Sequence, residues 1–274
     1  MIVKVCNADY SLQWDGIYQF ALENYPQIQE WELEKLAKFI AYEQDHCRQT
    51  IMECEDLELN IQIHDYLQEH SFFPPYRPSH QLVASTYDIQ RKLVTSNYCS
   101  HTCTVEVAQA IFQTGKLMSA VKVFGKSGAE LVTDSRNAAS DPADYFDYIM
   151  FGWSNTTSGY RLAMERLLGR APSEEELQEK FIPGVSFHFL YEELIQAPGY
   201  IFDGYHVAKV RDSLDLNTFL LLCVIPSKDK ACFEGLIPSQ LQDRVIYLDY
   251  EREGLQAWNT KVNQVLHGKD KLKE

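Results

Sequence analysis

The sequence predicts an α+β fold, with a helical region over residues 1–80 and a mixed domain of helices and strands over residues 81–274. Three observations support this division. Amphipathic helical spacing dominates the early part of the chain, short runs of β-branched and aromatic residues begin at about residue 93, and three prolines lie between residues 72 and 79. We place the boundary at this segment, because neither a helix nor a central strand can pass through it.

Two segments support the expected helical region. Leu33, Leu36, Ala37 and Ile40 recur at helical spacing with charged residues between them, which predicts an amphipathic helix over residues 31–47. A second helix is expected over residues 50–69, where the apolar positions are less regular.

Strands and helices alternate in the expected mixed domain. Gly115 and Gly169 suit the left-handed conformation in which helices commonly end, and Ser173 with Glu176 forms a capping box. The run 216–225 is nearly apolar throughout, which is typical of a central strand. The expected strands are 98–102, 185–189, 216–225 and 244–248, and the expected helices are 105–114, the second half of 145–168, and 253–266.

Composition and charge restrict the classes of partner. With 16 Tyr, 14 Phe and 4 Trp, the chain has too many aromatic residues for a disordered protein. Its 25 Lys and Arg against 39 Asp and Glu give a net charge of −14. Nucleic acids are held largely by cationic contacts to phosphate, so this charge disfavours a nucleic-acid partner.

The cysteines and the first residues suggest a cellular location. Seven cysteines lie at irregular intervals, and the chain begins without a basic segment and a long apolar stretch. The longest apolar run, residues 219–225, is far shorter than the ~20 residues of a membrane helix. We therefore expect a reduced, cytoplasmic protein without a membrane segment.

Several common chemistries leave no motif in the chain. It contains no glycine-rich phosphate loop, no Gly-x-Ser-x-Gly and no His-Glu-x-x-His. Cys99, His101 and Cys103 alternate along one expected strand, but same-face side chains lie about 7 Å apart, too far to share one zinc ion. The spacing of His46, Cys47, Cys54 and His64 fits no familiar metal site either, so we expect no bound metal.

The most informative stretch is an expected strand followed by a helix. Tyr98 to Thr104 reads Tyr-Cys-Ser-His-Thr-Cys-Thr, and the helix after it leads into Gly-Lys-Leu-Met-Ser at Gly115 to Ser119. Later blocks are Pro183 to Phe189, which holds Val-Ser-Phe, and Glu234 to Pro238, which reads Glu-Gly-Leu-Ile-Pro. In this order, the blocks resemble those of the ADP-ribosyltransferase superfamily, over about residues 93–250. The nearest likeness is to its DNA-modifying toxins with a His-x-Thr-type strand.

This resemblance implies a split, mostly antiparallel sheet with flanking helices and an activity that uses NAD as substrate. It implies that His101 contacts the adenosine ribose, together with the hydroxyl of Thr102 or Ser100. Ser186 belongs to the second block, which also contributes to the NAD site.

The chemistry of NAD cleavage suggests further roles. The reaction passes through an oxocarbenium-like sugar, which a carboxylate at the ribose 2′-hydroxyl stabilises, and we assign this role to Glu234. Phe187 or Tyr191 would stack on the cationic nicotinamide ring. Arg211, Arg136 or Arg161 would pair with the pyrophosphate. The expected function is thus an NAD-dependent ADP-ribosyltransferase or NAD glycohydrolase, with a protein or small-molecule acceptor.

Two alternatives stay open. The position of the superfamily's tyrosine has no clear occupant and a Cys-Phe pair precedes Glu234, so a non-catalytic interaction protein on the same scaffold is the second hypothesis. The aromatic run Tyr145 to Trp153 would then be its binding face, although such runs more often lie in a core. The third is an unrelated α+β enzyme that uses Asp203, His206 and Asp212.

Overall fold

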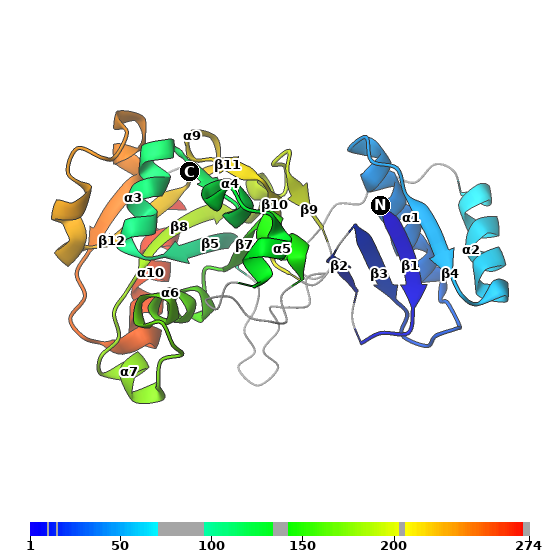
Figure 1. The fold of residues 1–274 in the computed structure, drawn as a ribbon, viewed down its shortest axis with the longest axis horizontal. Coiled ribbons are helices and arrows are strands. Elements are labelled where there is room, and N and C mark those ends of the chain that lie inside the picture. Colours follow the sequence, from blue (N-terminus) through cyan, green and yellow to red (C-terminus); the bar gives the residue numbers. More distant parts are fainter. Residues whose placement is uncertain (10, 15, 71–95, 134–141, 203–205, 271–274) are drawn as a thin grey trace. The chain divides into compact units, whose positions relative to one another are not determined.

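The computed structural model describes residues 1–9, 11–14, 16–70, 96–133, 142–202 and 206–270. The chain divides into two compact units (Figure 1). The first comprises Met1–Ser85 with Phe202–Tyr205, and the second comprises Thr86–Ile201 with His206–Glu274. Helices and strands occur together in both, which confirms the α+β class.

The first unit is a four-stranded sheet with two helices. The central strand β1 pairs in parallel with β3 and β4, and β2 pairs antiparallel with β3. In sheet order, the strands are β2 (Leu12–Trp14), β3 (Ile17–Ala21), β1 (Ile2–Cys6) and β4 (Ile51–Cys54); the helices are α1 (Glu30–Asp45) and α2 (Leu57–Glu69).

The expectation of a helical region over residues 1–80 is therefore wrong for the described residues, which hold four strands beside the two helices. The amphipathic helix over 31–47 is confirmed as α1, but the expected helix over 50–69 is a strand, β4, followed by the shorter helix α2. The Asp56 side chain fixes the start of α2, since it accepts a hydrogen bond from the Leu59 backbone nitrogen at 2.9 Å.

The core of the first unit lies against one face of this sheet. Val3, Val5, Tyr18 and Phe20 are buried there, and the rings of Tyr18 and Phe39 of α1 lie 4.2 Å apart. The burial alternates along β1 and β3, as expected when one face of a sheet is covered.

The second unit contains a seven-stranded sheet. Neighbouring strands pair antiparallel, except that β12 and β13 are parallel. In sheet order, the strands are β13 (Val245–Leu248), β12 (Leu222–Pro226), β8 (Val185–Leu190), β5 (Tyr98–Cys103), β7 (Tyr148–Trp153), β10 (Ala208–Arg211) and β9 (Tyr200–Ile201). A separate ribbon pairs β6 (Lys116–Met118) with β11 (Ser213–Asp215).

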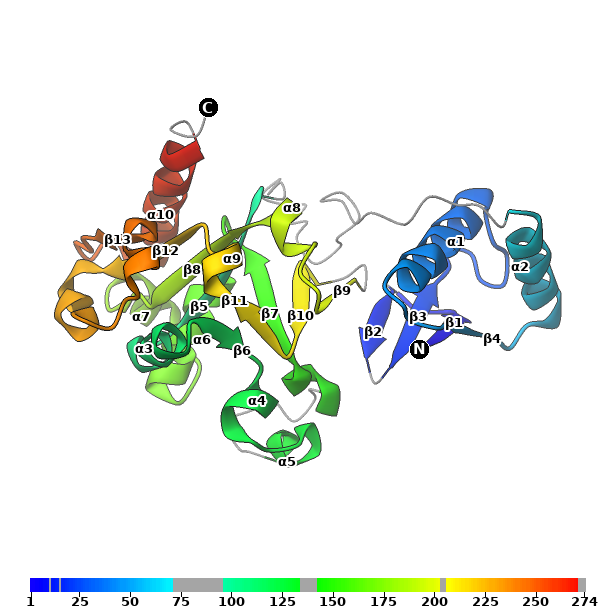
Figure 2. The same cartoon turned by 90° about the horizontal axis from the view of Figure 1, so that it is seen from above.

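The contact between β5 and β7 is unusually short. Both strands have six residues, yet only Cys99 with Trp153 and Ser100 with Gly152 are paired, whereas β5 pairs with β8 over its whole length. We call these two pairs and the residues next to them the β5–β7 junction. In Figure 2, β7 runs at a marked angle to β8.

Helices cover both faces of this sheet. On one face, Tyr160 and Met164 of α6 and Trp258 and Val262 of α10 form a buried cluster with Leu222 of β12. On the other face, Phe112 of α3 packs on Phe187, with ring centroids 5.4 Å apart. The helices are α3 (Val105–Thr114), α4 (Ala120–Phe124), α5 (Gly128–Val132), α6 (Ser158–Leu168), α7 (Glu174–Gln178), α8 (Tyr191–Leu194), α9 (Leu216–Phe219) and α10 (Gly254–Asp270); the 3-10 helices are η3 (Ala143–Asp147), η4 (Ser227–Phe233) and η5 (Ser239–Arg244).

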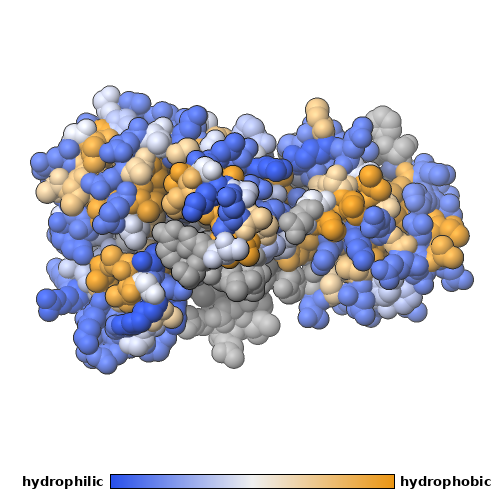
Figure 3. All heavy atoms as spheres, in the orientation of Figure 1, coloured by the Kyte–Doolittle hydropathy of each residue, from blue (hydrophilic) through white to orange (hydrophobic). Residues whose placement is uncertain are grey.

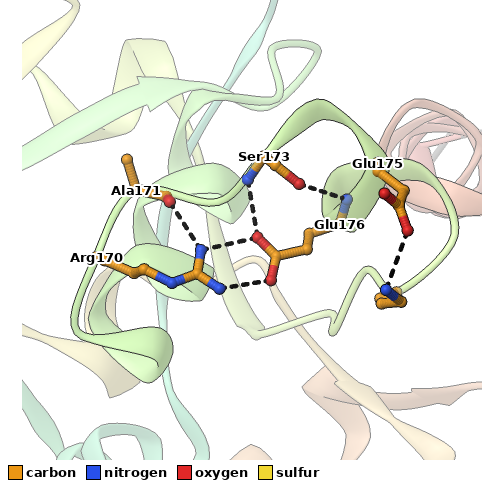
Figure 4. Close-up of polar contacts among 6 residues, drawn as sticks. Arg170, Ala171, Ser173, Glu175 and Glu176 are labelled. Atoms are coloured by element: carbon orange, nitrogen blue, oxygen red, sulfur yellow. Dashed lines mark hydrogen bonds and ion pairs between the residues drawn. The ribbon is translucent and has the colours of Figure 1, made fainter.

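Local signals predicted several of these elements. The helix over 105–114 and its end at Gly115, with φ of 67°, are confirmed. The capping box is also confirmed: Ser173 and Glu176 bond reciprocally, and Arg170 holds the Glu176 carboxylate with two nitrogens (Figure 4).

The expected strand over 216–225 is partly wrong. Its first four residues form the helical turn α9, and only Leu222–Pro226 is a strand. Asp215 accounts for the difference, because its carboxylate accepts a hydrogen bond from the Thr218 backbone nitrogen and thereby starts a helical turn. None of the described helices is long and apolar enough to span a bilayer.

Candidate functional site

His101 lies at the β5–β7 junction, directly after the last pair of the two strands. Its Nδ1 is 3.2 Å from the backbone carbonyl oxygen of Met150 on β7, and its ring meets the ring of Phe151 edge-on, with centroids 6.2 Å apart. A carbonyl oxygen only accepts hydrogen bonds, so Nδ1 carries the proton. Nε2 of the neutral ring is then a hydrogen-bond acceptor.

The surroundings of His101 favour the neutral ring. Burial lowers the pKa of His101, and the hydrogen bond to Met150 opposes this effect in part. The residue is nevertheless only half-buried. A half-buried neutral imidazole with an acceptor nitrogen is suited to bind a hydroxyl group, as the ribose-contact role requires.

Thr102 does not join His101 on one surface. Successive side chains of a strand point to opposite faces, so Thr102 faces the side that α6 covers. A Cβ at Gly159 would lie 2.8 Å from the Thr102 Oγ1, and a Cβ at Gly184 would lie 3.4 Å from its Cγ2. Thr102 thus fills a slot lined by two glycines, and the expected pairing of His101 and Thr102 is wrong. Ser100 lies on the same face as Thr102.

Ser186 is committed to the core. It is buried, its Oγ lies 2.8 Å from Nε2 of His188 and 2.9 Å from the hydroxyl of Tyr160, and His188 Nδ1 lies 2.9 Å from Ser154 Oγ. We call Ser154, His188, Ser186 and Tyr160 the buried polar chain. The expected contact of Ser186 with NAD is contradicted, since this hydroxyl has no surface for a ligand.

The two expected stacking residues are also in the core. Phe187 and Tyr191 have no exposed surface; Phe187 packs on Phe112, and Tyr191 packs on Trp153 with ring centroids 4.9 Å apart. Neither ring offers a face to a nicotinamide group. The proposed aromatic clamp is therefore contradicted.

Glu234 lies in an exposed turn after η4. The preceding Phe233 is buried against Phe112, with ring centroids 5.9 Å apart, which fixes the start of this turn. The pKa of Tyr247 on β13 is raised by burial, then by the nearby Cys223 and Glu234. Glu234 therefore lies beside β13. Strands β12 and β8 lie between β13 and β5, so these two strands are three strand spacings apart, about 14 Å across the sheet.

The three expected pyrophosphate ligands differ in their surroundings. Arg211 is exposed at the end of β10 and lies 4.0 Å from the Asp147 carboxylate, whereas Arg161 pairs with Glu174 at 3.3 Å. Arg136 lies outside the described residues. Of the arginines that the structure does place, none is shown in contact with His101 or Glu234.

The structure places only some residues of the other two hypotheses. Of the residues that an unrelated α+β enzyme would use, Asp203 lies outside the described residues, and the Asp212 carboxylate lies 3.6 Å from the Lys122 ammonium. The aromatic run 145–153 is mainly β7, and its Trp153 is buried. Within the described ranges, no three His, Cys, Asp or Glu side chains are grouped so as to hold a metal ion.

Sequence reasoning missed the buried polar chain. Ser186 and His188 are two residues apart on a strand, so they share a face, but Tyr160 and Ser154 come from other elements. Only the Ser-x-His spacing was available as a signal.

No protein-family model, curated protein or solved structure matches this chain.

Proposed function

We propose that the second unit binds NAD at the β5–β7 junction through His101 and cleaves the nicotinamide–ribose bond, as an ADP-ribosyltransferase or NAD glycohydrolase. The observation that carries this proposal is the state of His101: its Nδ1 is held by the Met150 carbonyl, which directs Nε2 away as a hydrogen-bond acceptor. A ribose hydroxyl is a matching donor.

The topology supports the same proposal. The sheet is mostly antiparallel, the histidine strand β5 lies near its middle, and the short β5–β7 pairing divides it into two parts. This arrangement resembles the split sheet of the ADP-ribosyltransferase superfamily. The blocks around His101, Ser186 and Glu234 lie on or next to β5, β8 and β13 of this sheet.

Glu234 would supply the negative charge that this reaction needs. A carboxylate close to the reacting ribose stabilises an oxocarbenium-like transition state. The side chain is exposed, so a ligand has access to it. The strand β5, which carries His101, and the strand β13, beside which Glu234 lies, are three strand spacings apart, about 14 Å across the sheet.

The proposal rests on His101 and Glu234, since Ser186, Phe187 and Tyr191 do not fit a contact with NAD. The net charge of −14 favours a protein or small-molecule acceptor over a nucleic acid. Cytoplasmic NAD would be the source of the substrate.

The test combines binding with turnover. NAD binding is measured by isothermal titration calorimetry, and nicotinamide release by chromatography, for the full chain and for His101→Ala and Glu234→Gln. Glu179→Gln, an exposed carboxylate elsewhere in the unit, is the matched control. We expect binding to depend on His101 and turnover to depend on Glu234. Absence of both in the unmodified chain overturns the proposal.

A second candidate is a non-catalytic interaction protein on the same scaffold. The observation in its favour is that three of the expected NAD contacts are buried in the core. It predicts no nicotinamide release at any NAD concentration, with or without NAD binding. Steady release that is lost in His101→Ala excludes it.

A further inference from the structure

Helix α2 of the first unit carries two exposed apolar side chains on one side. Leu57 and Ile61 are one helical turn apart and are 76% and 61% exposed. Leu59 and Ile63, which are buried, point about 200° away from them around the helix axis. The helix is therefore held in place by Leu59 and Ile63, and Leu57 and Ile61 are not needed for its packing. Figure 3 shows apolar atoms over α2 among hydrophilic ones.

A row of carboxylates borders these two apolar side chains. Glu58, Asp65 and Glu69 are exposed and lie within about 40° of one another around the helix. None of them takes part in an ion pair in the part of the chain that the structure describes. We call Leu57, Ile61 and these three carboxylates the α2 ridge.

The surrounding sequence adds to the negative charge. Residues 51–70 contain no Lys or Arg and six acidic residues, namely Glu53, Glu55, Asp56, Glu58, Asp65 and Glu69. Among the described residues, Glu55 is the one of these six in an ion pair, with the Lys4 ammonium at 3.3 Å. The segment itself thus carries only acidic charge, and the Lys38 of α1 that acts on Tyr66 is paired with Glu34, so the surface attracts cationic partners.

We propose that the α2 ridge is a docking surface for a basic amphipathic helix of another protein. Such a helix would place aliphatic side chains at helical spacing on Leu57 and Ile61, and Lys or Arg along its flank against Glu58, Asp65 and Glu69. A second copy of this chain does not fit, because two α2 ridges would bring like charges together. This inference does not depend on the NAD proposal, since it concerns the first unit.

The probe is a synthetic helical peptide of about 18 residues, long enough for about five turns. It carries leucines at helical spacing on one face and lysines on the flanks, with a fluorescent label for anisotropy. A second peptide has the same leucines with glutamate in place of each lysine. We expect the lysine peptide to bind the full chain at least about tenfold more tightly, and its affinity to fall as salt is raised.

Two variants of the chain test the site. Leu57→Ala with Ile61→Ala removes the apolar contact, and Glu58→Gln with Asp65→Asn and Glu69→Gln removes the charge. All five positions are exposed, so both variants should fold, which circular dichroism checks. We expect each to weaken binding of the lysine peptide at least about fivefold.

Helix α6 of the second unit supplies the matched control. Leu162 and Leu167 are 45% and 49% exposed, and their exposed neighbours are Arg161, Glu165 and Arg166 instead of a row of three carboxylates. Leu162→Ala with Leu167→Ala should leave binding unchanged. The inference is overturned by equal binding of the two peptides, by α2 variants that bind as well as the unmodified chain, or by an equal loss in the α6 control.

Discussion

His101 donates a hydrogen bond from Nδ1 to the backbone carbonyl oxygen of Met150, 3.2 Å away across the β5–β7 junction. At this point, a side chain of β5 makes the contact to β7 that a backbone group would make in a continuous ladder. The bond fixes both the tautomer and the direction of the imidazole. His101 therefore adds a side-chain bond to the two backbone pairs that join β5 and β7, and it is also the residue whose Nε2 is a hydrogen-bond acceptor.

The Glu234→Gln variant should separate turnover from binding. The amide keeps the shape of the side chain but removes the charge that would stabilise the oxocarbenium-like transition state in the proposed reaction, so we expect nicotinamide release to fall about 10²–10³-fold. Because the residue lies in an exposed turn, the fold should be unchanged. Steady-state release and calorimetric NAD titration of the same preparation measure the two quantities.

Glu179→Gln is the control for the loss of one exposed carboxylate, and it should turn over NAD at the unmodified rate. Equal activity of Glu234→Gln and Glu179→Gln would remove Glu234 from the account.

The buried polar chain predicts a pH-dependent stability. Burial lowers the pKa of His188 from its usual 6.5 to about 3, so at intermediate pH the unfolded chain takes up a proton here that the folded chain does not. The stability is thus fully present above pH 6.5 and falls toward pH 3, by about 1.4 kcal/mol per pH unit from this group. Urea denaturation between pH 7 and pH 5 measures the slope.

The His188→Gln variant should have a lower free energy of unfolding at pH 7 and a flatter slope, because the titrating group is gone. His64→Gln, which changes an exposed histidine of α2, should keep the slope of the unmodified chain. A slope that is the same in all three proteins would contradict this assignment.

Thr102 and Gly159 should be energetically coupled. An alanine at 159 would place its Cβ 2.8 Å from the Thr102 Oγ1, so Gly159→Ala should lower the free energy of unfolding by about 1–3 kcal/mol. Thr102→Ala removes the Oγ1 and leaves only the Thr102 Cβ, 3.2 Å from the new Cβ, so the same change at 159 should then cost less. A double-mutant cycle by urea denaturation measures the coupling.

Gly152→Ala is the control for the Gly159→Ala variant, at a glycine with more room for a new methyl group. Its nearest neighbour would be the Ser158 hydroxyl at 3.5 Å, an ordinary contact. A larger loss from Gly152→Ala than from Gly159→Ala would refute the slot around Thr102.

Local sequence signals predicted the elements that depend on their own residues. The helix α3 and its glycine end, the capping box at Ser173 and the strand around His101 all follow from neighbours within a few positions. The strands of the first unit were missed for the opposite reason. β1 pairs with β4, whose residues come nearly fifty positions later in the chain. In addition, the strands of the first unit have only three to five residues each.

The candidate site was predictable only in part for a similar reason. The face on which His101 lies follows from strand alternation, but the burial of Phe187 depends on Phe112 of α3, and that of Ser186 on Tyr160 of α6. A strand sequence such as Val-Ser-Phe-His-Phe does not indicate that both of its faces are covered. Tertiary contacts decided which motif residues remain accessible.

The most direct test of the account is a calorimetric titration of the full chain with NAD, compared with His101→Ala. His64→Ala on α2 is the control for loss of one imidazole, and circular dichroism checks that all three proteins are folded. The account predicts that the unmodified chain and His64→Ala bind NAD alike, and that His101→Ala binds at least about tenfold more weakly. Absence of NAD binding by the unmodified chain, or equal binding by folded His101→Ala, would contradict it.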